Sequence, residues 1–480
     1  MGGIFGVVSK EDCTEDLFYG TDYHSHLGTV NGGMVVKKDP NNTYVRSIHD
    51  ISNSQFRSKM DSELVKMRGA NMGLGVISDH DSQPLIVNSN LGVFSLVTVN
   101  KIANLEELVT MFHSRREHLL ERSGNEPNST EIIAALISKG SNYSKGLEIA
   151  QDMIQGSCST LLLTNEGIYA ARDKLGRTPL ILGKKEGSYA VTFETSAFEN
   201  LGFERERDLG PGEIVLITPE GIEQKKKPGN KMQICSFLGV YYGYPTSTYE
   251  GINVDRVRKK CGIALAEEDQ EDLELEKYKI DIVAGIPDSG NSHARGYSNH
   301  IKIPLESPLV KYTPTWPRSF MPQNPEMRKL IAKMKLIPNQ EFIRDKNLLF
   351  CDDSIVRGTQ LEKLIQKLRT YGVKQVHMRP ACPPLIYGCD FLNFSRSRSV
   401  LDLAGRRAIG ELEGLEKPSE DTLREYANPC SEKQCAMVEK IRERLGLTTL
   451  KYQKLDNLVS AIGLPKEKIC THCFDGSSYF

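Results

Sequence analysis

In the second half of the chain, an apolar strand, an acidic turn and a helix follow one another without interruption. The strand is Asn347–Cys351, the turn opens with Asp352-Asp353, and Gln360–Thr370 has the composition of a helix. A second apolar strand, Ile280–Ala284, also runs into a polar turn, and Val373–Met378 predicts a third strand. Apolar strands that alternate with helices are typical of parallel βαβ units. The second half is therefore predicted to be an α/β domain built on a parallel sheet.

The acidic turn has the composition of a binding site for a sugar phosphate. In an open α/β sheet, ligands lie beyond the carboxyl ends of the strands. Backbone N–H groups at the start of the following helix can bind a phosphate, and Gly358 allows that group to approach closely. Asp352 and Asp353 can accept the ribose hydroxyls beside Mg²⁺, a hard cation that prefers oxygen ligands. The predicted binding residues are Asp352, Asp353, Ser354, Ile355, Val356, Arg357, Gly358 and Thr359.

A plain helix cap is the alternative interpretation of this turn, because Asp commonly precedes a helix. For an isolated Asp-Asp pair that interpretation would hold. Here the whole string Cys351–Thr359 stands between a strand and a helix. A motif in its expected structural context is far more specific than a residue pair, which favours the binding site.

The first half of the chain is predicted to consist of strands and turns with a few helices. Short β-branched runs bounded by Gly, Asn and Asp occur at Ile4–Val8, Gly92–Val97 and Ser159–Thr164. The turn Thr218–Gly221 and the basic run Lys225–Gly229 follow, and they predict a hinge. The two predicted domains are residues 1–230 and 231–480.

Composition limits the partners of the protein. The formal net charge of the 480 residues is -1, which provides no overall field to attract nucleic acid or an acidic membrane. No segment approaches the ~20 apolar residues that span a bilayer, so we expect a cytoplasmic protein without nucleic-acid or membrane partners. The eleven cysteines, without a secretory signal, predict reduced thiols or metal ligands in place of disulfides.

With the acidic loop in view, the chain resembles the amidophosphoribosyltransferases, the glutamine-dependent enzymes of the first committed step of purine synthesis. The resemblance covers nearly the whole chain and implies that the ligand is 5-phosphoribosyl-1-pyrophosphate (PRPP). It also implies a type I phosphoribosyltransferase fold for the α/β domain. The turn Ile286–Gly290 resembles the family's pyrophosphate loop. This similarity adds Asp288, Ser289 and Gly290 to the predicted substrate contacts.

The segments Pro317–Pro322 and Glu326–Arg328 resemble the family's mobile loop, which closes over the substrate, and Lys335 lies where that loop ends. Cations there can neutralise the departing pyrophosphate, while closure excludes water from an oxocarbenium-like sugar. The alternative is a solvated basic loop, the state of most surface Lys and Arg. The order of the motifs favours catalysis. The predicted catalytic residues are Arg318, Lys335 and Arg357.

The segment Leu447–Phe474 resembles the C-terminal segment of the iron–sulfur members of the family. In those members four cysteines bind a [4Fe-4S] cluster, and thiolates are its expected ligands. The matching residues are Cys235, Cys389, Cys470 and Cys473. The role of the cluster would be structural or oxygen-sensing. Two alternatives remain, zinc bound by a different set of four cysteines or thiols that are small buried apolar groups. The zinc set is Cys430, Cys435, Cys470 and Cys473.

The first half resembles the family's glutaminase domain, an α+β N-terminal-nucleophile fold with an αββα sandwich. The similarity lies in the framework segments Gly3–Gly6, Ala171–Leu180 and Gly210–Glu213. Glutaminase chemistry requires a cysteine at the mature N-terminus, whose own α-amino group acts as the base. Gly2 stands at that position, and Cys13 cannot replace the cysteine because exposing it would delete the first strand.

Other positions of the glutaminase pocket also differ from the family. Ser78 and Leu27 stand where arginines are expected, and Val99-Asn100 replaces the Asn-Gly pair that supplies oxyanion donors. Ser129 stands near the position of an aspartate that holds the substrate amino group. Loss of one oxyanion donor alone costs ~100-fold or more in rate. We therefore expect that this domain does not hydrolyse glutamine.

These features predict an amidophosphoribosyltransferase-like enzyme that adds ammonia, or another amine, to C1 of PRPP. The alternative is a non-catalytic regulatory protein that uses the retained sugar-phosphate site as a switch. Such a protein usually carries a DNA-binding appendage and a basic face, and the sequence shows neither. The resemblance to the family further implies a homo-oligomer.

Overall fold

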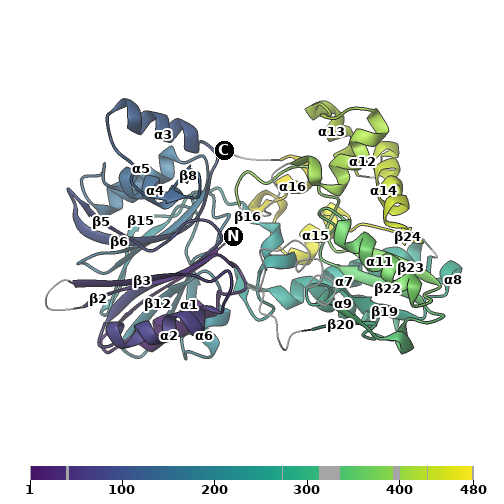
Figure 1. Cartoon of the computed structure of the whole chain (residues 1–480), viewed down its shortest axis with the longest axis horizontal. Helices are drawn as coiled ribbons and strands as arrows, with labels where there is room; N and C mark the ends of the chain where they lie inside the picture. Colours follow the sequence, from purple (N-terminus) through teal and green to yellow (C-terminus); the bar gives the residue numbers. More distant parts are fainter. Residues whose placement is uncertain are drawn as a thin grey trace.

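Two halves of the chain lie side by side in the computed structural model (Figure 1). The structure describes residues 2–38, 43–272, 274–312, 336–392, 400–429 and 431–477. The predicted fold class is confirmed, because an αββα sandwich is followed by an α/β domain with a parallel sheet. The amino-terminal end of the first strand lies at the side of the first half that faces the second (Figure 1).

The first half contains two stacked antiparallel sheets. The first has the order β13-β11-β12-β1-β4-β2-β3 and the second the order β15-β14-β10-β9-β6-β5. Their strands are β1 (Gly2–Ser9), β2 (Asn31–Lys38), β3 (Thr43–Asp50), β4 (Met72–Ser78), β5 (Leu85–Ser89), β6 (Gly92–Ile102), β9 (Gly156–Leu163), β10 (Ile168–Ala171), β11 (Ile181–Lys185), β12 (Ser188–Thr192), β13 (Glu204–Asp208), β14 (Ile214–Thr218) and β15 (Gly221–Lys226). Every residue of β1 is buried, because the strand lies between the second sheet and the helices.

Helices cover the outer face of each sheet. The helices of the first sheet are α1 (Thr14–Asp22), α2 (Phe56–Met67) and α6 (Ser196–Glu199). Those of the second sheet are α3 (Leu105–Ser114), α4 (Ser129–Ile137) and α5 (Tyr143–Met153). A small ribbon, β7 (Arg122–Ser123) with β8 (Glu126–Pro127), precedes α4. The arrangement gives the four layers of the predicted sandwich.

The second half is built on a parallel sheet of order β19-β22-β23-β24. Its strands are β19 (Ile282–Gly285), β22 (Asn347–Asp352), β23 (Gln375–Pro380) and β24 (Thr449–Leu450). Side chains of β22 alternate between two cores: Leu349 packs with α7 and α9, whereas Leu348 and Phe350 pack with α11. Both faces of the sheet are thus covered, as parallel sheets require.

The helices of the second half include a long pair on one face of the sheet and a group on the other. They are α7 (Val254–Glu271), α8 (Glu274–Tyr278), α9 (Gly290–Ile301), α11 (Thr359–Thr370), α12 (Ala404–Glu413), α13 (Glu420–Ala427), α14 (Glu432–Leu445), α15 (Leu455–Ile462) and α16 (His472–Asp475). A small antiparallel pair, β20 (Leu309–Lys311) with β21 (Leu336–Pro338), lies beside β19. The loops that follow β19 and β22 both emerge at the carboxyl edge of the sheet.

The connection between the halves begins later than the sequence indicates. Thr218–Gly221, predicted to start the hinge, is the turn between the paired strands β14 and β15. The chain leaves the second sheet only after Lys226. It then forms β16 (Ile234–Cys235), which pairs in parallel with β25 (Ile469–Cys470) from the C-terminal segment. The linker is therefore tied to a segment far away in sequence.

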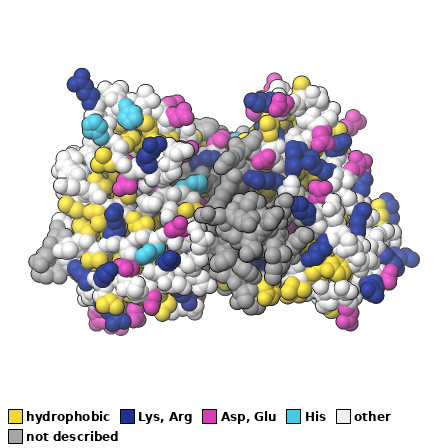
Figure 2. Space-filling view, in the orientation of Figure 1, with side chains coloured by type: hydrophobic (Ala, Val, Ile, Leu, Met, Phe, Trp, Pro, Cys, Tyr) yellow, Lys and Arg dark blue, Asp and Glu magenta, His cyan; other side chains and the backbone are white. Residues whose placement is uncertain are grey.

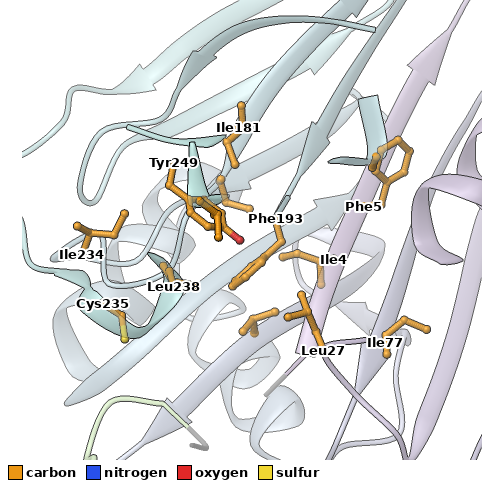
Figure 3. Close-up of a cluster of buried hydrophobic side chains, with 14 of the residues drawn as sticks. Ile4, Phe5, Leu27, Ile77, Ile181, Phe193, Ile234, Cys235, Leu238 and Tyr249 are labelled. Carbon is orange, nitrogen blue, oxygen red and sulfur yellow. The ribbon is translucent and has the colours of Figure 1, made fainter. Parts of the chain in front are cut away.

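A continuous apolar core crosses from the first half into the linker. Ile4 and Phe193 of the first sheet lie close to Leu238 and Tyr249 of the segment that opens the second half (Figure 3). All four side chains are buried. The two halves therefore share an apolar contact, and the hydrophobic free energy of that contact opposes their separation.

Charges of both signs are interspersed over both halves on the face shown in Figure 2. This distribution agrees with the near-zero net charge. In the part of the chain that the structure describes, no helix has the length and apolar character needed to cross a membrane.

Candidate active site

The two polar loops predicted from the sequence meet at the carboxyl edge of the parallel sheet. The Ile286 N–H donates to the Cys351 carbonyl at 3.0 Å, and the Ser289 hydroxyl donates to Asp352 Oδ1 at 3.4 Å. A Cβ on Gly290 would lie 2.3 Å from the Cys351 oxygen, so only glycine fits where α9 passes β22. The close approach brings Ser289 and Asp352 into one site.

Two carboxylates lie side by side at the end of β22. The Asp353 N–H donates to Asp352 Oδ1 at 2.9 Å, and the Ser354 hydroxyl donates to Asp353 Oδ2 at 2.6 Å. Burial and the charge of Asp353 raise the pKa of Asp352 well above its ordinary value. A divalent cation would relieve this repulsion, because Mg²⁺ is commonly held by one or two carboxylates together with substrate phosphates. The pair therefore fits magnesium.

No ready-made site for a single metal ion, formed by three or more His, Cys, Asp or Glu side chains, occurs among the described residues. The acidic pair provides only two protein carboxylates. Any magnesium bound there would need oxygen ligands from the substrate and from water, which is the usual arrangement for this ion.

The predicted phosphate loop is held in place by α12 and by the apolar core that Leu348 and Phe350 form with α11. Ile355 is buried in that core, and the Val356 carbonyl accepts the Ala404 N–H at 2.8 Å. Gly358 has φ +74, a conformation that favours glycine, and α11 begins directly after it. Since the first N–H groups of a helix lack partners within the helix, the start of α11 offers donors that could bind an anion.

The predicted catalytic cations are only partly placed. Arg357 Nη2 lies 3.9 Å from Asp402 Oδ2, at the rim of the phosphate loop. Arg318 and Lys335 fall within 313–335, outside the described residues. The same holds for the mobile-loop segments Pro317–Pro322 and Glu326–Arg328.

Arg258 is a buried arginine whose charge acts on the acidic pair and which the sequence does not single out. It lies on α7, is 4% exposed, and donates to the Tyr241 and Gly243 carbonyls at 2.8 Å each. Burial lowers the pKa of its guanidinium, and the nearby charge of Asp353 acts in the opposite direction. The sequence could have indicated this residue, because Arg258 falls on the apolar stripe of α7 and a charged side chain there needs a buried partner.

The structure brings together the four cysteines predicted to bind an iron–sulfur cluster. Cys235 and Cys470 are opposite each other in the β16–β25 pair. A hydrogen bond from the Cys473 thiol lowers the pKa of Cys389 to about 6, and the charges of Cys389 and Cys470 act on Cys235. Three segments distant in sequence therefore deliver thiols to one place.

The surroundings of these thiols fit a thiolate-bound cluster. The Leu392 N–H donates to the Cys389 sulfur at 3.3 Å, and backbone N–H groups also donate to the sulfurs of Cys235 and Cys470. Phe237 and Phe474 stack at 5.6 Å beside them. Hydrogen bonds to sulfur and burial are the features by which proteins stabilise iron–sulfur clusters.

The alternative zinc set is not assembled in the described part of the chain. Cys435 is exposed on α14, whereas Cys470 and Cys473 are buried. Cys430 lies outside the described residues. Tetrahedral zinc needs four ligand atoms at about 2.0–2.3 Å from one point.

In the first half, the position expected for the glutaminase nucleophile has no room for a side chain. Gly2 pairs with Ser78 across β1 and β4. A Cβ on Gly2 would lie 2.5 Å from the Ile77 carbonyl oxygen, closer than real Cβ atoms approach. Cys13 is completely buried beside α1, where burial raises the pKa of its thiol. Neither residue offers a nucleophile.

The remaining polar groups of this pocket bond to one another. The hydroxyls of Ser123, Ser129 and Thr130 and the Thr130 N–H all donate to the Asp81 carboxylate. The Ser129 hydroxyl also lies 2.8 Å from Asn100 Oδ1. Leu27 and Val99, which replace family residues, are buried. Of the altered positions, Ser129 and Asn100 thus belong to an internally paired network around Asp81.

Buried polar contacts join the two halves. Glu194, fully buried at the end of the first sheet, accepts the Tyr249 hydroxyl at 2.6 Å and the Tyr244 N–H at 3.0 Å, and His26 Nε2 lies 2.9 Å from it. Although burial acts to raise the pKa of Glu194, the charge of His26 and these hydrogen bonds hold it below its usual value. Glu194 therefore joins the two halves through polar contacts.

Comparison with known proteins places the chain among enzymes with the same two-part organisation. Residues 67–200 match a family described as a glutamine amidotransferase domain; this range begins after β1 and does not include Gly2. Over 99% of its length the chain is 28% identical to the amidophosphoribosyltransferase of Methanocaldococcus jannaschii, of which 97% is covered. It is 27% identical to the Bacillus subtilis amidophosphoribosyltransferase over 99% of this chain and 93% of that one.

Among solved structures, the chain is similar to the glutamine PRPP amidotransferase of B. subtilis in complex with ADP and GMP. The TM-score is 0.82 and the identity 25%, over 99% of this chain and 96% of that one. The similarity extends across both halves.

Proposed function

Because the chain belongs to the amidophosphoribosyltransferase family, we propose that it transfers an amino group to C1 of PRPP in purine nucleotide synthesis. The observation that carries this proposal is the meeting of two loops at one sheet edge. Ser289 of the first loop bonds to Asp352 of the second, beside Asp353 and the start of α11. Carboxylates, hydroxyls and helix N–H groups together complement a phosphorylated ribose.

In the proposed reaction, the nitrogen lone pair attacks C1 while the bond from C1 to pyrophosphate breaks. Pyrophosphate leaves with the electron pair, and the new ammonium group loses a proton to water. Asp352 and Asp353 hold the ribose hydroxyls, the loop Ser354–Thr359 holds the 5-phosphate, and Asp288–Gly290 contact the pyrophosphate. Magnesium, when bound, would neutralise charge on the leaving group.

The proposed cationic contacts to pyrophosphate are Arg357, Arg318 and Lys335. Arg258 is proposed to act through its charge, which influences Asp353, while its side chain is held by the Tyr241 and Gly243 carbonyls. Its positive charge would partly balance the negative charge of the acidic pair. Orientation of charged groups before the reaction is a large contribution to rate in enzymes of many kinds.

The proposed nitrogen donor is ammonia, free or delivered by another protein. Support comes from the first half, where Gly2 leaves no room for a thiol and Asp81 is occupied by neighbouring donors. Among the described residues of that pocket, glutamine would meet no thiol at the expected position, and the Asp81 carboxylate already accepts hydrogen bonds from the chain. A nucleophile is indispensable to this type of amide hydrolysis.

Cys235, Cys389, Cys470 and Cys473 are proposed to bind a [4Fe-4S] cluster with a structural or oxygen-sensing role. Support comes from their convergence and from the backbone donors to their sulfurs. The cluster would tie the linker, the sheet domain and the C-terminal segment together. The transfer reaction itself needs no electron.

The test measures pyrophosphate release by the full-length chain with Mg²⁺ and PRPP. Ammonia and glutamine are supplied separately, and a small panel of amines follows. Release with ammonia but not with glutamine is expected. Fast release with glutamine alone would overturn the ammonia proposal. Tight magnesium-linked binding of PRPP without release for any amine would instead indicate the non-catalytic regulatory protein.

A further inference from the structure

Two cationic side chains of the first half reach the cysteine group of the second half. Lys101, at the end of β6, donates from Nζ to the Cys389 carbonyl. Arg177 lies with its guanidinium carbon 3.6 Å from the centre of the Phe391 ring and donates to the Cys470 sulfur. Both contacts cross the boundary between the two halves.

Arg177 is held in place by hydrogen bonds to the first half and to the linker that opens the second half. It is 2% exposed, its Nη1 donates to the Gly156 carbonyl at 3.2 Å, and its Nη2 donates to Gln233 Oε1 at 3.3 Å. The Arg177 N–H donates to Asp173 Oδ2 at 2.8 Å, which fixes the backbone as well. The guanidinium is therefore fixed in position beside Cys470.

Lys101 is equally well placed. It pairs with Ser157 in the β6–β9 ladder and directly follows Val99-Asn100, the pair that stands where oxyanion donors are expected. The end of β6 thus places a lysine beside Cys389. Its side chain is half-buried, so solvent screens the charge only in part.

A cluster bound by four thiolates carries net negative charge, and reduction makes that charge larger. Nearby cations therefore stabilise the reduced form more than the oxidised form, and they raise the reduction potential. The effect is stronger in a buried setting than in water, because the local dielectric constant is lower. Contacts to the backbone and ring beside the ligands also keep the Cys389 and Cys470 segments in position.

We propose that Lys101 and Arg177 are positioning residues through which the first half holds the Cys389 and Cys470 segments and raises the reduction potential of the bound cluster. The proposal rests on the cluster-binding part of the proposed function and is independent of the nitrogen donor. It gives the first half a role that does not depend on glutamine hydrolysis.

The experiment compares the full-length wild-type chain with Lys101→Met, Lys101→Arg and the control Lys145→Met. Lys145 is exposed on α5 and pairs with Glu148, so its removal changes the charge equally without touching the cysteines. Each chain is loaded anaerobically with iron and sulfide. Iron and sulfide content, cluster loss to a chelator and the potential from an EPR-monitored redox titration are then measured.

Lys101→Met is expected to shift the potential to more negative values and to weaken cluster retention by about 10-fold, the lower end of outer-shell effects on metal binding. Lys101→Arg should restore most of the potential, since it keeps the charge, and Lys145→Met should match wild type. A Lys101→Met chain with wild-type potential and retention would overturn the inference.

The variant Arg177→Lys tests whether Arg177 acts through its charge or through its planar guanidinium group. The variant keeps a cation near Cys470 but loses the planar contact with Phe391 and two hydrogen bonds. Its potential should stay closer to wild type than that of Lys101→Met, while cluster retention falls. A potential shift as large as that of Lys101→Met would contradict a charge effect.

A wild-type chain that binds zinc, or no metal, in place of iron and sulfide would overturn both this inference and the proposed cluster. Pyrophosphate release with ammonia distinguishes that outcome from failure of the whole proposed function. Release would persist if only the cluster were absent, because none of the four cysteines lies in the loops that contact PRPP.

Discussion

Two polar networks at strand ends, one in each half, differ in how their charges are compensated. In the first half, Asp81 accepts hydrogen bonds from Ser123, Ser129 and Thr130, so donors of the chain itself surround the carboxylate. In the second half, Asp352 lies beside Asp353, and its pKa is raised by burial and by that neighbouring charge. A network closed on itself has no energetic need of a ligand. A crowded pair of carboxylates gains free energy when a cation arrives.

The largest effect is expected where the crowded pair is removed. Asp352→Asn with Asp353→Asn should lower pyrophosphate release by about 1000-fold, or ~4 kcal/mol of barrier, because the ribose contacts and the magnesium ligands are lost together. Release is measured with saturating ammonia. Circular dichroism should show an unchanged fold. Retention of more than a tenth of the activity would show that the comparison between the halves is wrong.

The second half also contains a buried ion pair away from the acidic pair, which is expected to stabilise the fold and not to bind substrate. Asp269 accepts Arg379 Nε at 2.7 Å, and both residues are buried. Asp269→Asn should destabilise the second half by about 3 kcal/mol, because it leaves Arg379 buried without its counter-ion. Urea unfolding at pH 7 measures this loss. A change below 1 kcal/mol would mean that the pair contributes little to the fold.

The stability of the second half is also expected to depend on pH through Asp269. Although burial acts to raise the pKa of Asp269, Arg379 and its other partners hold the folded-state pKa below its usual value. Its stabilisation is therefore complete above the unfolded-state pKa of about 3.9 and decreases as the pH falls towards the folded-state pKa. The stability difference between wild type and Asp269→Asn should shrink below about pH 4. A difference that grows there would contradict this sign.

A new thiol in the first half tests whether only the nucleophile has been lost. Gly2→Cys should restore no glutamine-dependent release and should destabilise that half by about 2 kcal/mol, since its Cβ meets the Ile77 carbonyl. Glutamate production and thermal unfolding measure the two effects. Glutamine hydrolysis by this variant would show that the pocket still works once it has a thiol.

The smallest effect is expected from a helix cap in the altered pocket. Asn128 accepts the Thr130 and Glu131 N–H groups at the start of α4. Asn128→Ala should lower the stability of the first half by about 1 kcal/mol. Pyrophosphate release with ammonia should stay at the wild-type rate. A loss of activity without a loss of stability would assign the pocket a part in the reaction.

Local patterns were sufficient to predict the elements that surround the candidate site. The strand Asn347–Cys351 and the helix Gln360–Thr370 correspond to β22 and α11 within one residue at each end. The run Ile4–Val8 lies within β1. Apolar runs bounded by turn residues carry this information within a few neighbouring positions, so no distant contact is needed to interpret them.

Contacts between segments that are distant in sequence could not be predicted from local patterns. The turn Thr218–Gly221 has residues that suit a hinge and a hairpin equally, and only the pairing of β14 with β15 decides between them. The contact of Lys101 with Cys389 likewise depends on how the halves meet. Arg258 is the exception, because its place among the apolar residues of α7 already indicated a buried partner.

The pairing of β16 with β25 has a consequence for biosynthesis. Ile234 and Cys235 leave the ribosome long before Ile469 and Cys470, their partners in that small sheet. Translation proceeds at about 5–20 residues per second, and amino-terminal domains fold first. The early strand must therefore wait for a late one, and any product that terminates before Cys470 keeps an open edge there. Such an edge is a recognisable mark of incomplete synthesis for chaperones and proteases.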